Sequence, residues 1–162
     1  MWQGAVKVKL EFLADNQEAL PVVAKWYFDQ WGHLSRGNTL AKVTRSLGEY
    51  LNKDKIPLIV LAVEAEEVLG AAQLKYREMD IYPEKEHWLG GVYVSRLHRG
   101  NNIAEQVIEK ILSVAKQLGV HKLYLQTPHL DGGLYNRLGW KPLNTVNHRG
   151  LDVLVMEKNL WE

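Results

Sequence analysis

The stretch "VYVSRLHRGNNIAEQVIEKIL", residues 92–112, changes from one periodicity to another within a few residues. It begins with the alternation typical of a β-strand and ends with apolar residues every three or four positions, which is typical of an amphipathic helix. Between them lies the basic segment 96–102, which contains Gly100. The stretch therefore predicts a strand, a basic turn and a helix in direct succession.

The junction of this turn and helix predicts an anion site. The first N–H groups of a helix have no intrahelical acceptor, and the helix dipole makes that end partly positive. Gly100 would let an anion approach the backbone, and Arg96, His98 and Arg99 add basic side chains. The alternative is structural: Asn102 caps the helix through its side chain, and the arginines are simply solvated.

Composition excludes several classes of protein. The length of 162 residues fits one domain, residues 1–162, with a sizeable core. Twenty basic and 19 acidic residues leave a net charge of +1, which gives no electrostatic case for nucleic acid or a membrane surface as a partner. The absence of cysteine excludes disulfides, thiolate nucleophiles and cysteine-bound zinc, and no metal is expected. Without a long apolar run or a signal-peptide pattern, we expect a cytoplasmic protein.

The remaining elements follow from periodicity and capping residues. Asn16 is a candidate cap for the first helix and Thr39 for the second, while Gly119 is expected to end the third. Gly90 and Gly91 lie inside a strand and suggest a bulge. The predicted strands are 6–13, 58–64, 69–77, 87–95, 121–127 and 151–160, and the helices are 16–32, 39–52, 102–118 and 132–139, with one or two strands expected after the last helix. This order predicts an α/β (α+β) fold with a mixed sheet and helices on both faces.

Residues 99–104 resemble the acyl-CoA-binding motif of the GNAT superfamily of N-acetyltransferases, Gln/Arg-x-x-Gly-x-Gly/Ala. Arg99 and Ala104 match the motif, and Gly100 is an additional glycine. Asn102 stands where the family usually has its central glycine. Because asparagine tolerates a left-handed backbone better than other non-glycine residues, we expect the loop to keep its shape.

A second block supports the resemblance. The run Tyr135-Asn136-Arg137-Leu138-Gly139-Trp140 is similar to the family signature Tyr-x-x-x-Gly-aromatic, and the likeness extends over residues 58–160. The resemblance implies the GNAT fold, with a mostly antiparallel twisted sheet. It implies direct transfer of an acetyl group from acetyl-CoA to a primary amine of a small molecule or a peptide N-terminus. The alternative is a non-catalytic acyl-CoA-binding regulatory module on the same fold.

The resemblance also implies roles for the residues that would hold acetyl-CoA. Main-chain groups of one strand would pair with the pantetheine arm, and one strand N–H would stabilise the developing oxyanion. Loop N–H groups would bind the pyrophosphate. The strand residues are Val92, Tyr93 and Val94, and the loop residues are Arg99, Gly100, Asn101, Asn102, Ile103 and Ala104.

For catalysis, Tyr135 matches the family tyrosine that protonates the thiolate; the alternative is that it only packs against the sulfur or forms a hydrogen bond with it. Some relatives use a strand glutamate as the general base, but Trp88 occupies that position here. Glu86, His87 and His129 are the alternatives, and at most one of the first two can point inward from a regular strand. A water chain could serve instead.

The acceptor pocket is expected between the first two helices and the loops near Tyr82 and His148, with Trp31 in its wall and Tyr27 in the core. The acidic residues Asp80, Glu84 and Glu86 either attract a cationic amine or lie in a solvated loop. The helical segment around Trp31 weakly resembles GNAT members that acetylate protein N-termini; the alternative acceptor is a small amine, such as a polyamine, an amino acid or an aminoglycoside. We expect a monomer or homodimer.

Overall fold

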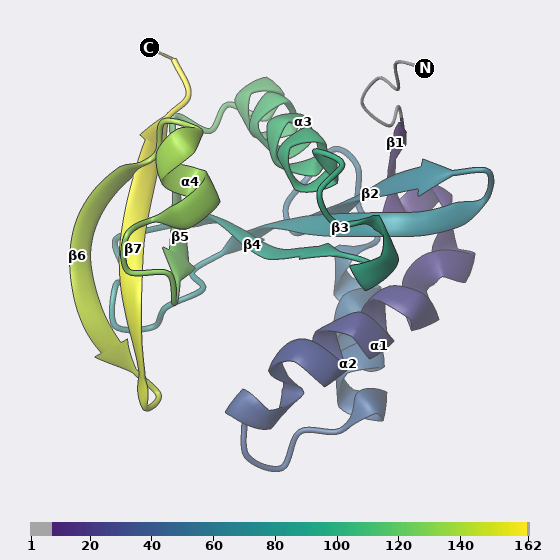
Figure 1. Ribbon diagram of the computed structural model, residues 1–162, viewed down its shortest axis with the longest axis horizontal. Coiled ribbons are helices and arrows are strands. Elements are labelled where there is room, and N and C mark those ends of the chain that lie inside the picture. The colour runs from purple at the N-terminus through teal and green to yellow at the C-terminus, as the bar shows by residue number, and fades with distance from the viewer. Residues whose placement is uncertain (1–7, 162) are drawn as a thin grey trace.

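The computed structural model describes residues 8–161, which form a mixed seven-stranded sheet with helices on both faces (Figure 1). The strand order is β1-β2-β3-β4-β5-β7-β6, and β4 and β5 are the parallel pair in an otherwise antiparallel sheet. The strands are β1 (Lys9–Phe12), β2 (Leu58–Glu64), β3 (Glu67–Tyr76), β4 (His87–Val94), β5 (Lys122–Thr127), β6 (Lys141–His148) and β7 (Leu151–Asn159). The helices are α1 (Leu20–Trp31), α2 (Leu40–Leu47), α3 (Ile103–Gln117) and α4 (Gly133–Arg137). The predicted mixed sheet covered on both faces is confirmed.

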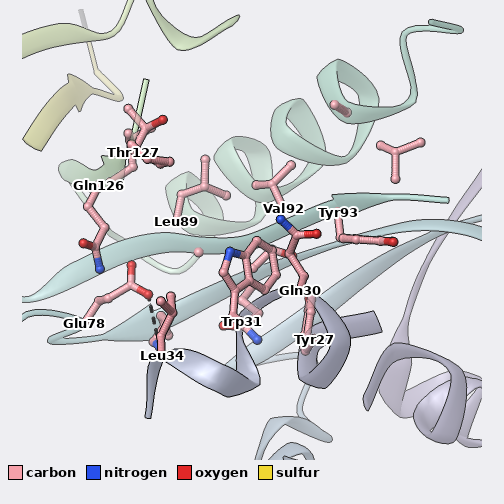
Figure 2. A pocket seen from close by; sticks show the side chains of 18 of the residues that line it. Tyr27, Gln30, Trp31, Leu34, Glu78, Leu89, Val92, Tyr93, Gln126 and Thr127 are labelled. Atoms are coloured by element: carbon pink, nitrogen blue, oxygen red, sulfur yellow. Dashed lines mark hydrogen bonds and ion pairs between the residues drawn. The ribbon is translucent and has the colours of Figure 1, made fainter. Parts of the chain in front are cut away.

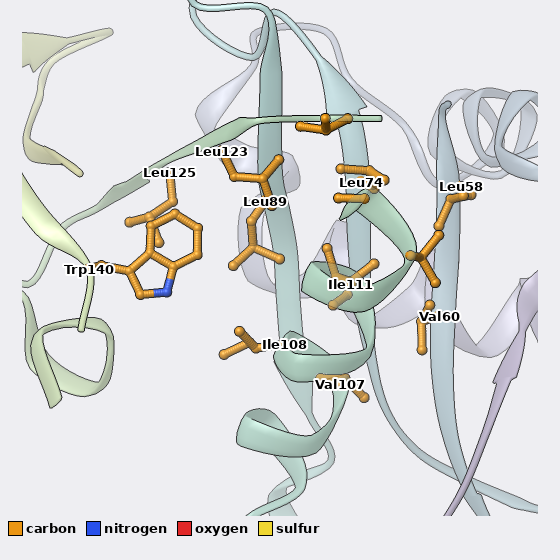
Figure 3. Packing of buried hydrophobic residues seen from close by; sticks show 14 of the residues in the cluster. Leu58, Val60, Leu74, Leu89, Val107, Ile108, Ile111, Leu123, Leu125 and Trp140 are labelled. Carbon is orange, nitrogen blue, oxygen red and sulfur yellow. The ribbon is translucent and has the colours of Figure 1, made fainter. Parts of the chain in front are cut away.

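The two faces of the sheet are visible in the alternation of β2. Leu58 and Val60 pack in the cluster beneath α3, whereas Ile59 and Leu61 pack in the cluster beneath α1 and α2. Because successive strand residues point to opposite faces, an unbroken apolar strand can support helices on both sides. Figure 3 shows Leu58, Val60, Leu74 and Leu89 against α3.

The expected bulge in β4 lies at Gly91, which has a φ of +54°. The pairing of β3 with β4 changes register between Ala71↔Tyr93 and Gln73↔Gly90. As a result Leu89 and Val92, three residues apart, both pack in the α3 cluster. The bulge thus turns the end of β4 to present Val92 and Val94 to α3 and Tyr93 to the opposite face.

The predicted caps and element ends are partly confirmed and partly wrong. Asn16 does not cap α1; its side chain donates to Glu11, and α1 begins after Ala19. Thr39 does cap α2, with Oγ1 accepting from the N–H of Lys42 at 3.1 Å. The second helix is shorter than predicted, because its last turn tightens into a 3-10 helix, Gly48–Tyr50. Positions 6 and 7 of the first predicted strand lie outside the described residues.

Candidate active site

A cleft of about 1080 Å³ opens where β4 and β5 separate. The two strands pair at Trp88↔Tyr124, and beyond that point they diverge. The cleft is lined by the ends of both strands, by the end of α1, by the start of α3, by α4 and by the turn between β6 and β7. Figure 2 shows Leu89, Val92 and Tyr93 along one wall, with Gln126 and Thr127 on another.

The edge of β4 that faces the cleft can bind an extended ligand with amide groups. Among the described residues, β4 pairs with β5 at Trp88 and not beyond it, so the main-chain groups on the β5 side of its later residues face the cleft, while those on the other side pair with β3. Val92, Tyr93 and Val94 all line the cleft. An extended ligand with amide groups, such as pantetheine, can pair with such an edge as an added strand. The three residues predicted to bind pantetheine therefore lie together on the edge of β4 that faces the cleft.

The basic turn brings the loop residues to the start of α3. Asn102 adopts a left-handed backbone, φ 61° and ψ 20°, and its side chain does not cap the helix. The alternative in which Asn102 acts as a side-chain cap is therefore wrong. The backbone of Gly100 also has a positive φ of 86°, and a Cβ at that position would meet nothing within 4 Å. This open loop can admit an anion to the first N–H groups of α3.

The Arg99 side chain turns back onto β4. Its Nε donates to the carbonyl of Val94 at 3.1 Å, and its guanidinium lies 5.4 Å from the ring centre of Tyr93. Arg99, Gly100, Asn102, Ile103 and Ala104 line the cleft. The remaining loop candidate, Asn101, is outside the cleft lining and donates to the carbonyl of His98 at 3.1 Å.

Tyr135 lines the cleft from α4, where its ring is 6.2 Å from that of Trp140 in an edge contact. Burial, and to a lesser degree the negative charge of Glu78, raises the pKa of Tyr135 to about 12. The phenol therefore keeps its proton at neutral pH. It can donate a hydrogen bond to a ligand in the cleft.

Glu78 is a cleft residue that no sequence pattern singled out. It follows the end of β3, where strand alternation no longer predicts direction. Its carboxylate is 3.5 Å from the Lys75 ammonium, and its side chain is 20% exposed. A Cβ on Gly90 would lie 3.4 Å from its oxygens, so the missing side chain at Gly90 leaves room for the carboxylate.

Lys75 and Glu78 form a partly buried charged pair. Burial alone would lower the pKa of Lys75, but Glu78 and Tyr50 together raise it above its ordinary value. The ammonium is therefore held in its charged form beside Glu78. Glu78, Lys75 and Tyr50 all line the cleft.

Of the three candidate bases predicted from the sequence, only His129 lines the cleft. Glu86 and His87 are outside the cleft lining; Glu86 is half exposed, and its Oε1 is 3.6 Å from Nε2 of His87. His129 does line the cleft. Trp88, at the position of the family's glutamate, is fully buried, and its indole N–H donates to the carbonyl of Lys85 at 2.7 Å. The geometry thus favours Glu78 and His129 over Glu86 and His87.

Aromatic residues form the wall of the cleft next to α1. Tyr27 is buried as predicted, and its hydroxyl donates to the carbonyl of Gly91 at 2.7 Å. Trp31 lies in the cleft wall, with its ring 5.6 Å from Tyr27 and 6.3 Å from Tyr93. The aromatic segment was expected either to close the core or to line a pocket. Tyr27 does both, since it packs in the core and also lines the cleft.

Two further features concern metals and membranes. Among residues 8–161, no three histidine or acidic side chains are placed to hold a metal ion together. No helix in that range is sufficiently long and apolar to cross a membrane.

The chain matches the model of the acetyltransferase (GNAT) family over residues 20–140. Its fold is similar to that of an N-acetyltransferase from Staphylococcus aureus Mu50, with a TM-score of 0.76 and 19% identity over 96% of this chain and 99% of the other. An aminoglycoside 6'-N-acetyltransferase complexed with coenzyme A gives a TM-score of 0.74 and 16% identity over 95% and 98%. A ribosomal-protein-alanine N-acetyltransferase from Brucella melitensis gives 0.70 and 21% over 95% and 99%. None of the curated proteins matches the chain significantly.

The family match covers most of the chain and includes β4, the basic turn and α3. The diverging strands, the open loop at Gly100 and the left-handed Asn102 fit the pantetheine and pyrophosphate of acetyl-CoA. The chain belongs to the GNAT family of acetyltransferases, which take their acetyl group from acetyl-CoA.

Proposed function

We propose that this protein transfers the acetyl group of acetyl-CoA directly to the nitrogen of a primary amine. The observation that carries the proposal is a protonated phenol and a carboxylate lining one cleft beside the free edge of β4. The two are close enough for the charge of Glu78 to contribute to the raised pKa of Tyr135. Amide formation from a thioester needs one group that takes a proton from nitrogen and one that supplies a proton to sulfur.

Glu78 is the proposed base. An amine enters the cleft as an ammonium, and the Glu78 carboxylate accepts one of its protons directly or through a water. The freed nitrogen attacks the thioester carbonyl, a C–N bond forms, and a main-chain N–H of β4 stabilises the oxygen that gains charge. The Lys75 ammonium lies 3.5 Å from the same carboxylate and fixes its position in the cleft.

Tyr135 is the proposed hydrogen-bond donor to sulfur. As the C–S bond breaks, the phenol donates to the departing thiolate, and the nitrogen loses its second proton to solvent. A phenol with a pKa of about 12 is a weaker acid than a thiol of ~8.5, so the phenol takes a proton back from solvent as the sulfur leaves. Glu78 then releases to solvent the proton that it took from the ammonium. The products are the N-acetyl amide, CoA thiol and one proton.

The first test separates binding from turnover. Acetyl-CoA at about 100 times its dissociation constant should raise unfolding stability by roughly 2.7 kcal/mol, seen as a higher melting temperature. Thiol release is then followed with a panel of primary amines. Because the chain has no cysteine, released CoA is the single source of thiol in the assay. No stabilisation by acetyl-CoA or CoA would contradict the proposal.

The second candidate is a regulatory module that binds acyl-CoA without turnover. The absence of a strand glutamate at Trp88 favours it, and Glu78 in the cleft opposes it. Stabilisation by acetyl-CoA without thiol release for any amine would support the module.

A further inference from the structure

Building on the proposed acetyl transfer, we propose that the acceptor is an amine with a single positive charge on an apolar body of aromatic size. Polycationic amines are rejected by Arg149. The inference rests on the charged and apolar residues that line the cleft outside the loop at Gly100. This part of the lining, which we call the acceptor half, includes Leu34, Glu78, Arg149 and Leu151.

Carboxylates are scarce in this half of the cleft. Among the described lining residues the acidic side chains are Glu78 and Glu105. Glu105 lies in the first turn of α3, beside the loop that would hold the pyrophosphate. Glu78 is thus the one carboxylate of the described lining left for an acceptor, and Lys75 already neutralises it in part at 3.5 Å. One ammonium can be accommodated, but a second would find no counter-charge.

The acidic loop between β3 and β4, which was a candidate for binding a cationic amine, does not line the cleft. Asp80, Glu84 and Glu86 are exposed and are outside the cleft lining. Of the two readings of this segment, the structure therefore supports a solvated loop.

Arg149 adds a positive charge to the rim. It occupies the turn between β6 and β7 and lines the cleft. The described residues give it no ion-pair partner within 4.0 Å. Its charge is therefore not cancelled locally and opposes a second ammonium entering from that side.

Exposed apolar side chains also line the cleft. Leu34, in the 3-10 helix Gly32–Leu34 after α1, is 42% exposed, and Leu151, the first residue of β7, is 40% exposed. Both line the cleft together with Trp31. Figure 2 shows Trp31 and Leu34 on the same side as Glu78. An apolar body between these residues would remove exposed apolar surface from water, while its amine reaches Glu78.

The experiment compares kcat/KM for four acceptors at saturating acetyl-CoA. The monocations are 2-phenylethylamine and a tetrapeptide with an N-terminal phenylalanine and an amidated C-terminus, which distinguish a small molecule from a peptide as the source of the amine. The polycations are spermidine and kanamycin. We expect kcat/KM for at least one monocation to exceed that for both polycations by more than about tenfold.

Arg149→Glu tests the rejecting charge. It should raise kcat/KM for spermidine by about tenfold or more and leave the better monocation within about threefold. Lys55→Glu is the matched control, because it makes the same change of charge at an exposed position outside the cleft lining. It should leave the preference between the acceptors unchanged.

The outcomes separate this inference from the proposed function. Turnover that prefers spermidine or kanamycin would overturn the inference and leave acetyl transfer standing. Stabilisation by acetyl-CoA without turnover of either monocation would also overturn it. An Arg149→Glu variant with the wild-type preference would remove Arg149 from the explanation and contradict the proposal as stated. No binding of acetyl-CoA would instead contradict the proposed function.

Discussion

Gly91 connects the packing of the core with the shape of the cleft. Its positive φ of +54° makes the bulge that turns Val92 and Val94 toward α3. Its carbonyl accepts the hydrogen bond from Tyr27 at 2.7 Å, which ties β4 to α1. The residue thus fixes the position of the strand edge that would bind pantetheine.

Gly91→Ala should therefore be strongly destabilising. The new Cβ would lie 2.7 Å from Cδ of Gln73 and 2.8 Å from the Tyr27 hydroxyl, on a backbone that side chains rarely adopt. We expect a loss of about 3 kcal/mol in unfolding free energy, from overpacking and backbone strain together, measured by urea denaturation. Gly119→Ala is the control, because Gly119 also has a positive φ, +83°, but open space around its Cβ position. Equal losses in the two variants would show that the contacts at Gly91 are unimportant.

At Tyr135 the prediction concerns turnover rather than stability. Tyr135→Phe removes the donor to sulfur and should lower kcat by about 10²-fold, with acetyl-CoA affinity within about twofold by calorimetry. Because the pKa of Tyr135 is raised to about 12, wild-type kcat should show no loss from this group as pH rises to 10. Tyr76→Phe, at an exposed position outside the cleft, is the control and should behave as wild type. Full activity of Tyr135→Phe would refute the donor role.

At the scale of elements, periodicity predicted most of the fold. The apolar run of β2 and the spacing of Val107, Ile111 and Val114 in α3 report burial directly, so these elements were found in the right places. The basic turn before α3 was also found, because Gly100 and the helix start are local features. Glu78 was missed because its direction depends on how the chain leaves β3 and on the space above Gly90. Glu86 and His87 were named as bases because they directly precede Trp88, the position of the family's glutamate, but the structure places both outside the cleft lining.

The junction between the basic turn and α3 gives a prediction for Asn102. Its left-handed backbone, φ 61°, is natural for glycine, so Asn102→Gly should keep acetyl-CoA affinity within about threefold. Asn102→Asp keeps the size of the side chain but places a negative charge beside the proposed pyrophosphate site, and should weaken binding by about tenfold. Calorimetric titration with acetyl-CoA measures both. Equal affinities for the Asp and Gly variants would mean that the pyrophosphate is held elsewhere.

At the scale of the whole molecule, the layers that form the cleft also bury titratable groups. The α1 and α2 layer buries Tyr27, and burial raises its pKa far above the ordinary value. Burial likewise raises the pKa of Tyr50, and that of Tyr135 reaches about 12. Each phenol keeps its proton in the folded state at a pH where the unfolded chain has lost it. Folding therefore binds protons in alkaline solution.

This proton binding predicts a loss of stability at alkaline pH. The contribution of these phenols is fully present below about pH 10, the ordinary pKa of tyrosine, and is lost as pH rises above it. Each such group should reduce the unfolding free energy by up to about 1.4 kcal/mol per pH unit. Lys75, with its raised pKa, acts in the same direction. Urea midpoints measured from pH 8 to 11 should fall steeply in the upper part of that range.

Tyr27→Phe isolates the contribution of one buried phenol to this effect. At pH 8 the variant should be less stable by about 1 to 2 kcal/mol, because the Gly91 carbonyl loses its donor at 2.7 Å. Its stability should then fall less steeply than that of wild type above pH 10, since phenylalanine has no proton to lose. Tyr76→Phe, which removes an exposed phenol, should leave the slope unchanged. Parallel curves for wild type and Tyr27→Phe would mean that Tyr27 ionises in the folded protein as readily as in the unfolded chain, and that the α1 layer does not exclude water from the bulge.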